Sequence, residues 1–342
     1  MRIVILGLPQ AGQQELFSVI SGVPLDTIRQ KPMEAQVGSC NVRDPRITKL
    51  SQMYKPKKTT YTRIEYLLLP DFTTQGPSKS LILTELRNAD ELCWVAQAGS
   101  AEADINTFLA ELIINDLMLV EKRLENINRE LKSRQSDERL KEKALMELCQ
   151  KQLNLEQPVS ALEMSDEQKK QLRTTYQFLT IKPIVLVVNV PEDKIKDASI
   201  ALAIREKYHH PCVQLSAGLE AEIGQLAESE RGEFMKELGI DEPAVDKLSR
   251  LVYEGLGLIS FFTVGEDEVR AWPVRRSASA AEAGGVIHTD IAKGFVRAEH
   301  FTYDDLIALG SEDKIKEAGK FSLKGRDYIV QDGDILSFRF NV

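Results

Sequence analysis

The sequence predicts an α/β protein in which a mostly parallel sheet is interrupted by a helical hairpin and followed by a small α+β domain. Three patterns support this prediction. Short apolar runs alternate with helical patterns before residue 98 and again after residue 182, as in parallel sheets covered by helices on both faces. A stretch without glycine or proline, residues 101–131, separates these two parts. From residue 259 onward, short strand-like runs surround two helical segments.

The composition is that of a folded protein with two or three domains, because 342 residues exceed the size of one ordinary core. A net charge of -8 argues against broad wrapping of nucleic acid, so we expect no DNA partner and look for RNA contacts only in local basic regions. The four cysteines form no C-x-x-C pair, which predicts free thiols and no metal site.

The amino terminus leads directly into an apolar strand, without the pattern of a signal peptide, and no apolar run reaches the roughly 18 residues that span a bilayer. We therefore expect a cytoplasmic protein with reduced thiols and no membrane partner.

The sheet elements are predicted from short apolar runs. Before the interruption these are residues 3–6, 61–69 and 92–96, with a short helix near 81–86; after Lys182 and Pro183 they are "IVLVVN" and "PCVQLSA". Ligands of open α/β sheets bind beyond the carboxyl ends of the strands. Gly7 to Gly12, Asn189 and Ser216 are expected to meet there.

The interrupting segment predicts a long amphipathic helix over 101–131, because apolar residues recur at four-three spacing between Ile113 and Leu131. A returning helix carries Leu140, Ala144, Leu145 and Leu148, and Ser165 with Gln168 fits the capping box of a third helix. A hairpin packed only on itself is favoured over a functional surface. In the last domain, strands are predicted at "ISFFTV", "EVRAWPV", "FVRAEHF", "RDYIV" and "DILSFRF", with helices near 278–283 and 303–308.

The stretch "LGLPQAGQQELF" has the strand, glycine turn and helix of a phosphate-binding loop, with Gly7 and Gly12 at the spacing of G-x-x-x-x-G-K-[ST]. The lysine position holds Gln13 and the Ser/Thr position holds Gln14. Glutamine cannot supply the charge of lysine. A self-capped strand-to-helix turn is therefore slightly favoured over a working phosphate site.

Longer stretches resemble the Obg-like ATPases (YchF-type), a family of P-loop proteins in the GTPase class: "DPRITKL", "FLTIKPIVLVVNVPED", "EFMKELGIDEP", "FFTVGEDEVRAW", "GGVIHTDIAKGFVRAE" and "DYIVQDGDILSFRFNV". The resemblance implies a P-loop G-type domain over 1–98 and 179–258, a coiled-coil hairpin over 99–178, and a ubiquitin-like (β-grasp) TGS domain over 259–342. It also implies ATP or GTP as the nucleotide, and ribosome or RNA as a partner of the hairpin and the TGS domain.

Against the family pattern, several positions that serve Mg²⁺ and phosphate are altered. Glu15 stands where the family has Thr, and the strand that should end in D-x-x-G has Leu68 at the Asp position and Asp71 at the Gly position. A second register makes Asp71 the acid and leaves Thr74 at the Gly position. Pro32 stands about where a metal-binding Thr is expected. We assign no catalytic residue and no metal ligand, and the changes argue against Mg²⁺.

The resemblance also indicates residues for three roles. The vestigial phosphate loop comprises Gly7, Pro9, Ala11, Gly12, Gln13 and Gln14, and the base-binding positions are Asn189, Val190, Glu192, Ser216 and Ala217. An equal alternative is that Asn189 only ties neighbouring loops together. The candidate RNA or partner face comprises Arg270, Arg275, Arg276, Lys293, Arg297, Lys320, Lys324 and Arg326, which must cluster to attract phosphate. His288 has no nucleophile nearby and is interpreted as a structural hydrogen-bonding group.

Three functions remain open. The first is a non-hydrolysing or weakly nucleotide-binding scaffold that acts on the ribosome. The second is an active nucleoside-triphosphate hydrolase, in which Arg29, Lys31 or Lys79 replaces the missing lysine. The third is a site for a nucleoside or a nucleoside monophosphate, for which the sequence gives no positive sign.

Overall fold

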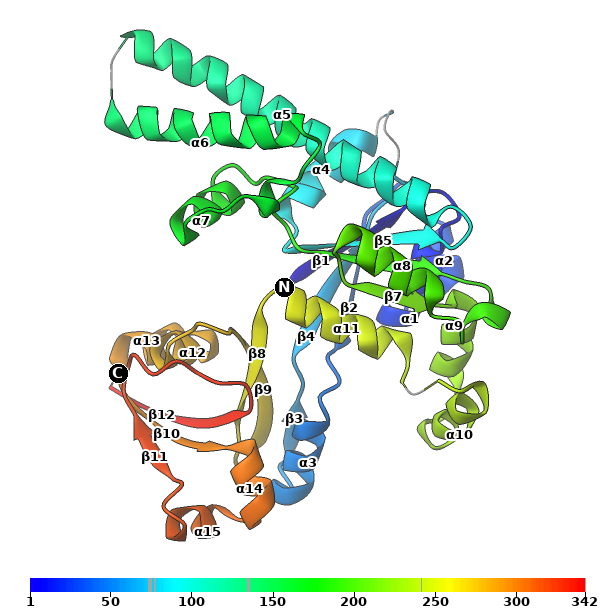
Figure 1. Ribbon diagram of the computed structural model, residues 1–342. Helices are drawn as coiled ribbons and strands as arrows, with labels where there is room; N and C mark the ends of the chain where they lie inside the picture. Colours follow the sequence, from blue (N-terminus) through cyan, green and yellow to red (C-terminus); the bar gives the residue numbers. More distant parts are fainter. Residues whose placement is uncertain (73–75, 77, 134–135, 241, 342) are drawn as a thin grey trace. The chain divides into compact units, whose positions relative to one another are not determined.

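The computed structural model describes residues 1–72, 76, 78–133, 136–240 and 242–341. The chain forms two compact units. The first unit comprises Met1–Gly38 and Glu65–Val245, and the second comprises Ser39–Ile64 and Asp246–Val342. Each unit therefore contains two separate stretches of the chain (Figure 1).

A six-stranded sheet forms the centre of the first unit, in the order β2-β4-β1-β5-β6-β7. The pairs β1–β4, β1–β5, β5–β6 and β6–β7 are parallel, as predicted. The strands are β1 (Arg2–Gly7), β2 (Gln36–Asn41), β4 (Arg63–Leu68), β5 (Glu91–Gln97), β6 (Ile184–Asn189) and β7 (Cys212–Leu215). The central strands β1, β5 and β6 are apolar runs because both faces of the sheet are buried there, whereas the edge strand β2 is partly exposed.

Helices pack on this sheet and bury its apolar side chains. On one face, the Trp94 and Phe108 rings stack at 4.3 Å between their centroids, and Phe72 meets both rings edge-on. The helices of this part are α1 (Gln13–Ser21), α2 (Leu25–Arg29), α4 (Ser78–Asn88), α8 (Ser199–Tyr208), α9 (Ala217–Gln225) and α10 (Glu228–Leu238), with a short 3-10 turn η2 (Glu192–Lys194).

The predicted hairpin is present, with α5 (Ala101–Ser133) and α6 (Asp137–Asn154) antiparallel (Figure 1). After the turn η1 (Val159–Ala161), helix α7 (Asp166–Thr174) begins with the predicted capping box. Val120, Leu124 and Ile127 of α5 are buried as predicted. On α6 the predicted face is correct only in part: Leu145 is buried as expected, but Leu140 and Leu148 are exposed, and the other buried apolar residues are Met146, Cys149 and Leu153.

The second unit contains a mixed six-stranded sheet in the order β11-β10-β12-β8-β9-β3. Its strands are β3 (Lys58–Thr60), β8 (Leu258–Thr263), β9 (Glu268–Arg275), β10 (Phe295–Thr302), β11 (Ser322–Lys324) and β12 (Asp334–Phe340). Its helices are α3 (Pro45–Tyr54), α11 (Ala244–Gly255), α12 (Ala280–Ile287), α13 (Thr289–Gly294), α14 (Tyr303–Leu309) and α15 (Glu312–Glu317). Phe261 and Phe262 point to opposite faces and belong to separate cores.

The strand predicted at "RDYIV" is wrong, since Ile329 makes only one isolated bridge, to Ser279. The alternating residues Tyr328 and Val330 pack beside the start of α12 instead of joining a ladder, and the Val330 amide donates to the Ala278 carbonyl. The strand β11, just ahead of this segment, was not predicted.

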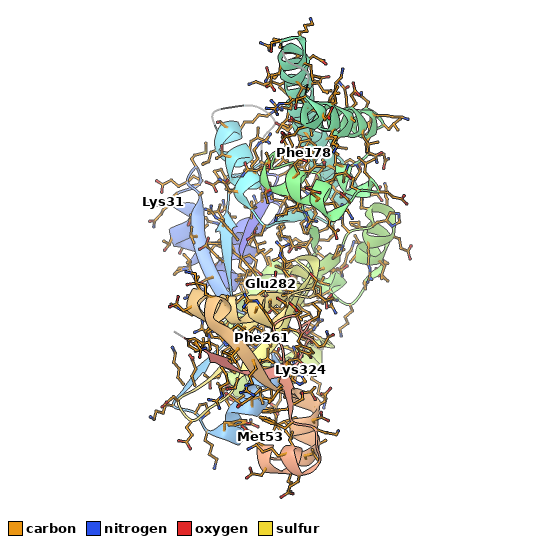
Figure 2. All side chains as sticks on the ribbon, turned by 90° about the vertical axis from the view of Figure 1, so that its left-hand side faces the viewer. Lys31, Met53, Phe178, Phe261, Glu282 and Lys324 are labelled. Carbon is orange, nitrogen blue, oxygen red and sulfur yellow. The ribbon has the colours of Figure 1, made fainter. Side chains whose placement is uncertain are left out.

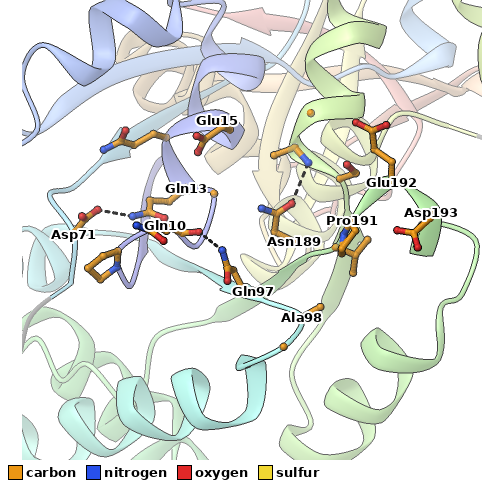
Figure 3. A pocket seen from close by; sticks show the side chains of 18 of the residues that line it. Gln10, Gln13, Glu15, Asp71, Gln97, Ala98, Asn189, Pro191, Glu192 and Asp193 are labelled. Carbon is orange, nitrogen blue, oxygen red and sulfur yellow. Dashed lines mark hydrogen bonds between the residues drawn. The ribbon is translucent and has the colours of Figure 1, made fainter.

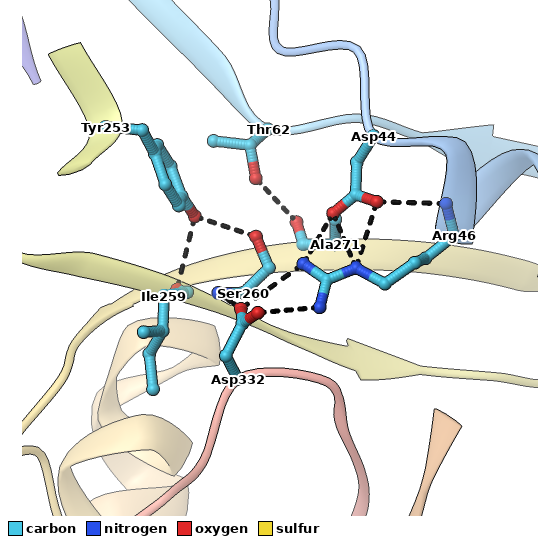
Figure 4. A network of polar contacts seen from close by, with 8 residues as sticks. All are labelled: Asp44, Arg46, Thr62, Tyr253, Ile259, Ser260, Ala271 and Asp332. Atoms are coloured by element: carbon cyan, nitrogen blue, oxygen red, sulfur yellow. Dashed lines mark hydrogen bonds and ion pairs between the residues drawn. The ribbon is translucent and has the colours of Figure 1, made fainter. Parts of the chain in front are cut away.

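A polar network inside the second unit ties its two stretches together (Figure 4). The Arg46 guanidinium bonds Asp44 through Nε at 3.0 Å and Asp332 through Nη1 at 2.7 Å. Asp332 also accepts the Ser260 amide at 2.9 Å. The compact units thus divide the chain differently from the domains expected over 1–98, 179–258 and 259–342, because residues 39–64 and 246–258 belong with the last stretch.

Side-chain burial follows these cores. Phe178 beside the hairpin and Phe261 in the second unit are fully buried, whereas Lys31 projects outward (Figure 2).

Candidate functional site

A cavity of about 1190 Å³ lies at the carboxyl ends of the strands of the first unit (Figure 3). All five predicted base-binding residues line it, and so do Pro9, Gly12, Gln13 and Gln14 of the predicted phosphate loop. Gly7 and Ala11 are not among the lining residues. The structure therefore brings together two groups of residues that are about 180 positions apart in the sequence.

The loop between β1 and α1 has the backbone of a phosphate loop. Gly12 adopts φ 99°, and a Cβ there would lie 2.3 Å from Nδ2 of Asn189. A Cβ at Gly7 would lie 2.6 Å from the Val95 carbonyl oxygen. Glycine is thus required at both positions, because neighbouring atoms leave no room for a Cβ. Helix α1 begins at Gln13, and no side chain caps its first turn.

The buried side chain of Gln13 holds this loop by hydrogen bonds. Its side chain is buried, and its Nε2 donates to Asp71 Oδ1 at 2.6 Å and to the Leu8 carbonyl at 3.2 Å. Its Oε1 is also buried and has no hydrogen-bond partner among the described residues. The residue at the lysine position therefore bonds the loop itself and the segment after β4 (Figure 3).

The side chain of Gln13, and not that of Glu15, makes the hydrogen bonds that hold this loop. Glu15 lies in the first turn of α1, where its carboxylate was expected to offset the helix dipole. The Glu15 carboxylate instead pairs with Arg29, at 2.7 Å from its Nη2. The turn favoured from the sequence is therefore not self-contained, because the Gln13 amide bonds Asp71 after β4 as well as the Leu8 carbonyl within the loop.

Negative charge dominates the cavity lining. Four carboxylates face one arginine: Glu15, Asp71, Glu192 and Asp193 against Arg29. The other cations proposed to replace the lysine do not line the cavity: Lys31 pairs with Glu34 and Lys79 with Glu111. Of those three candidates, only Arg29 lines the cavity.

The residues present do not fit Mg²⁺. Leu68 is buried in β4 beside Ile5, and Pro32 is exposed outside the cavity lining. Asp71 is engaged by Gln13, and Thr74 of the second register lies outside the described residues. In the described ranges, no group of three or more His, Cys, Asp or Glu side chains is placed to hold a metal ion.

Asn189 joins the two sides of the cavity. Its Nδ2 donates to the Ala11 carbonyl at 3.2 Å, and its Oδ1 accepts the Ala217 amide at 3.1 Å. These bonds are the loop tie that was weighed against base recognition, and they already use the Ala217 amide. Glu192 lies beside Gly218, where a Cβ would be 3.1 Å from the carboxylate.

Sequence reasoning missed Gln97, which ends β5 and also lines the cavity. Its Nε2 donates to the Gln10 carbonyl at 2.6 Å, in a loop where Gln10 has φ 67°. The signal was available, because the rule that placed Asn189 at the carboxyl end of β6 applies equally to the last residue of β5.

The predicted basic face does not form a single patch. Arg270 and Arg275 lie on β9, whereas Arg297 and Lys324 lie on β10 and β11 toward the other edge of the sheet. Part of the group lies near this second edge: Arg326 donates to the Ala292 carbonyl beside Lys293, and Lys324 is opposite Ala298, the neighbour of Arg297. Lys320 pairs with Asp305, and Arg276 is exposed after β9. The sequence could not show this division because it does not show strand order, and contact of these residues with RNA or a partner stays a prediction.

His288 has the structural role expected of it. Its Nδ1 accepts the Asp290 amide at 3.3 Å and so caps α13.

No helix in the described part of the chain combines the length and the apolar character needed to cross a membrane.

A parallel sheet with a glycine loop after its first strand, and a polar cavity at the carboxyl ends of that sheet, define the class of P-loop-type G domains. The comparisons are more specific. A family model named YchF-GTPase_C, described as "Protein of unknown function (DUF933)", matches residues 258–341. The "Ribosome-binding ATPase YchF" of Bacillus subtilis (strain 168) is 35% identical over 99% of this chain and 98% of its own length.

The Escherichia coli O157:H7 protein of the same name is 34% identical over the same shares. The solved structure of the Schizosaccharomyces pombe YchF GTPase superposes with a TM-score of 0.85 at 25% identity, covering 99% of this chain and 97% of the other. The chain belongs to the YchF family, which confirms the family expected from the sequence.

Proposed function

We propose that this chain is a ribosome-associated member of the YchF family that does not hydrolyse nucleoside triphosphates, because the cavity at the carboxyl ends of its first sheet lacks the charges for phosphoryl transfer. The observation that carries the proposal is the double hydrogen bond from the Gln13 amide to Asp71 and Leu8. At the position of the missing lysine, the neutral amide thus bonds two acceptors of the protein itself and places no positive charge near a phosphate.

Electrostatics supports the same conclusion. Phosphoryl transfer depends on positive charge placed around the transferred group, because charge spreads over its oxygens in the transition state. Here the lining carries four carboxylates, and its one arginine is already paired with Glu15. Without a lysine or a fitting Mg²⁺ site, several kcal/mol of transition-state stabilisation is missing.

The partner is taken from the relatives, whose printed name is ribosome-binding ATPase. In this proposal the α5–α6 hairpin, as the coiled coil, and the second unit, as the TGS-type domain, contact the ribosome. Ribosome association places the protein in the cytoplasm. The cavity then has a structural role within the first unit, with neither ATP nor GTP as a required cofactor.

The direct test is calorimetry and turnover with purified full-length protein. ATP, GTP, ADP and GDP, with and without Mg²⁺, are expected to give little heat and no hydrolysis above a blank. Ribosome co-sedimentation without added nucleotide is expected to succeed. Turnover that disappears in Gly12→Val would overturn the proposal, since Gly12 approaches Asn189 inside the loop.

An active hydrolase with rewired residues is the second candidate, favoured by one observation. Arg29 lines the cavity and is half-exposed, so release from Glu15 would bring its guanidinium to a bound phosphate. In that case Arg29→Gln abolishes turnover and Lys31→Gln does not. The Lys31 variant is the matched control, because its ammonium pairs outside the cavity.

A nucleoside or nucleoside monophosphate is a third candidate ligand, favoured because all five base-side residues line the cavity. Adenosine, guanosine, AMP and GMP belong in the same calorimetric series. Heat with these ligands and none with triphosphates would select this candidate.

A further inference from the structure

Strand β3 pairs with β9 at the edge of the sheet in the second unit (Figure 1). A second concave site lies at this edge, and all of its lining residues belong to the second unit. It has a volume of about 540 Å³. We call it the β3–β9 groove. Its main side chains are those of Lys58, Thr60, Arg63, Arg270 and Trp272, and its rim includes Asn41, Tyr61 and Val286.

Strand alternation explains why these residues share one face. Thr60 is opposite Arg270 in the β3–β9 register, and Trp272 lies two residues further along β9. Side chains two apart in a strand point the same way. Trp272 packs in the core that α12 covers, but at this edge α12 contributes only Val286 to the lining. The end of the sheet face near β3 therefore stays open.

The groove has the opposite charge character to the nucleotide-type cavity. Three cations, Lys58, Arg63 and Arg270, line it together with hydroxyl groups, and no carboxylate is among the lining residues. Lys58 is partly compensated by Glu268, at 3.5 Å. Within the described residues, neither Arg63 nor Arg270 has an ion pair with a carboxylate.

Arg270 is also held in place. Its guanidinium lies over the Trp272 ring, 3.7 Å from the ring centroid. The indole Nε1 is anchored in turn by the Thr263 hydroxyl at 3.0 Å. Stacking fixes one face of the planar cation, so the entropy lost on binding an anion is reduced.

We infer that the β3–β9 groove binds the phosphate backbone of single-stranded RNA, an inference that rests on the proposed ribosome association and gives it a specific surface. Unpaired cations supply the phosphate contacts, and a fixed guanidinium plane offers a base a stacking surface. The Asn41 amide matches the 2′-hydroxyl, since each is both donor and acceptor, whereas the Thr60 hydroxyl already donates to Glu268 at 2.6 Å. The groove is too small to hold a duplex.

The test is fluorescence anisotropy of the full chain with a labelled oligouridylate of about 12 nucleotides, at several salt concentrations. Arg63→Gln combined with Arg270→Gln is expected to weaken binding at least tenfold. It should also lower the slope of log K against log salt by about 1.4, at about 0.7 for each lost phosphate contact. Arg275→Gln combined with Arg297→Gln removes equal charge from exposed positions outside the groove and is expected to change binding less than twofold.

Several outcomes would overturn the inference. Equal weakening by both double variants would show diffuse charge rather than a site. Tighter binding of duplex RNA than of the oligouridylate, or equal competition by polyglutamate, would exclude single-stranded RNA as the preferred ligand. Failure of the wild-type chain to bind the oligouridylate would also contradict it.

Tryptophan fluorescence locates the ligand independently. The chain has two tryptophans, and Trp94 is fully buried in the first unit. RNA is expected to quench the wild-type emission and to leave Trp272→Phe unquenched. Co-sedimentation separates the two proposals. If wild-type protein does not bind ribosomes, the proposed function fails; if the wild type and the Arg63/Arg270 variant bind ribosomes equally, only the groove assignment fails.

Discussion

Among single residues, Gly12 is constrained both by its backbone conformation and by its surroundings. It combines a left-handed φ of 99° with a position where a Cβ would lie 2.3 Å from Nδ2 of Asn189. We expect Gly12→Ala to lower the free energy of unfolding by about 3 kcal/mol or more, because backbone strain of about 1 to 3 kcal/mol adds to displacement of Asn189. Urea denaturation followed by circular dichroism measures this loss.

Gly22→Ala is the matched control, because Gly22 also has positive φ, 73°, but a Cβ there meets nothing within 4 Å. Gly22→Ala is expected to lower the free energy of unfolding only through backbone strain, by about 1 kcal/mol. Equal costs for the two variants would show that the contact with Asn189 is unimportant.

Glu91 supplies a prediction about pH. Its side chain is fully buried, and both carboxylate oxygens lack hydrogen-bond partners among the described residues. Burial, with a smaller effect of Asp90, raises the pKa of Glu91 to about 9. The folded state therefore prefers the protonated acid, so the wild-type chain loses stability as pH rises from about 4.5 toward 9.

Glu91→Gln removes this titration. We expect the variant to be more stable than the wild type by about 3 kcal/mol at pH 7, with little difference at pH 4. Thermal unfolding at pH 4, 5.5, 7 and 8.5 gives the difference directly. A stability difference that does not vary with pH would contradict the assigned protonation.

The residue-level departures from the phosphate-loop pattern were visible in the sequence, since Gln13, Gln14 and Leu68 are read directly from it. The bond from Gln13 to Asp71 was not, because it joins positions 58 residues apart through the pairing of β1 with β4. Chemical type can be predicted from the sequence, whereas partners across a sheet depend on strand order and register.

Among the helices and strands, α6 shows how a small error in helix phase changes a prediction. Leu145 is buried against α5, whereas Leu148 is 40% exposed. We expect Leu145→Ala to lower the stability by about 2 to 4 kcal/mol, because it leaves a cavity in the hairpin core. Leu148→Ala is expected to cost less than about 1 kcal/mol. Urea denaturation of both variants makes the comparison, and similar losses would place both side chains in the core.

Most elements were predictable, because long periodic segments specify their type. The hairpin helices and the strands β1, β4, β5 and β6 follow directly from apolar periodicity. The segment "RDYIV" misled because its alternating Tyr328 and Val330 serve to pack against α12 as a loop. The three-residue strands β3 and β11 are too short to carry a periodic signal.

For the whole molecule, the division into units was the least predictable feature. Residues 39–64 look continuous with the first sheet, yet Ile47 and Leu50 are buried against Phe262, Val269 and Phe301. Nothing local in "DPRITKL" shows that its partners lie about 200 residues away. The family resemblance predicted a last domain over 259–342, close to the 258–341 of the family model, whereas the compact unit also contains residues 39–64 and 246–258.

This packing predicts that residues 246–342 do not fold cooperatively alone. Ile47 and Leu50 each contribute about 1.5 to 3 kcal/mol by burial, and the bonds from Arg46 to Asp332 are lost with them. That loss is a large part of the stability of a small domain. Joining residues 39–64 to this fragment by a flexible linker is expected to restore a cooperative thermal transition in circular dichroism. A sharp transition of 246–342 without that segment would contradict the prediction.

The split second unit also has a consequence for synthesis. Residues 39–64 leave the ribosome about 180 residues before the chain reaches residue 246, so their apolar partners do not yet exist. At about 5 to 20 residues per second, this interval lasts roughly 10 to 40 s. Throughout that time Ile47 and Leu50 have no native core to enter. The nascent chain therefore offers a chaperone-accessible segment well before its own fold can bury it.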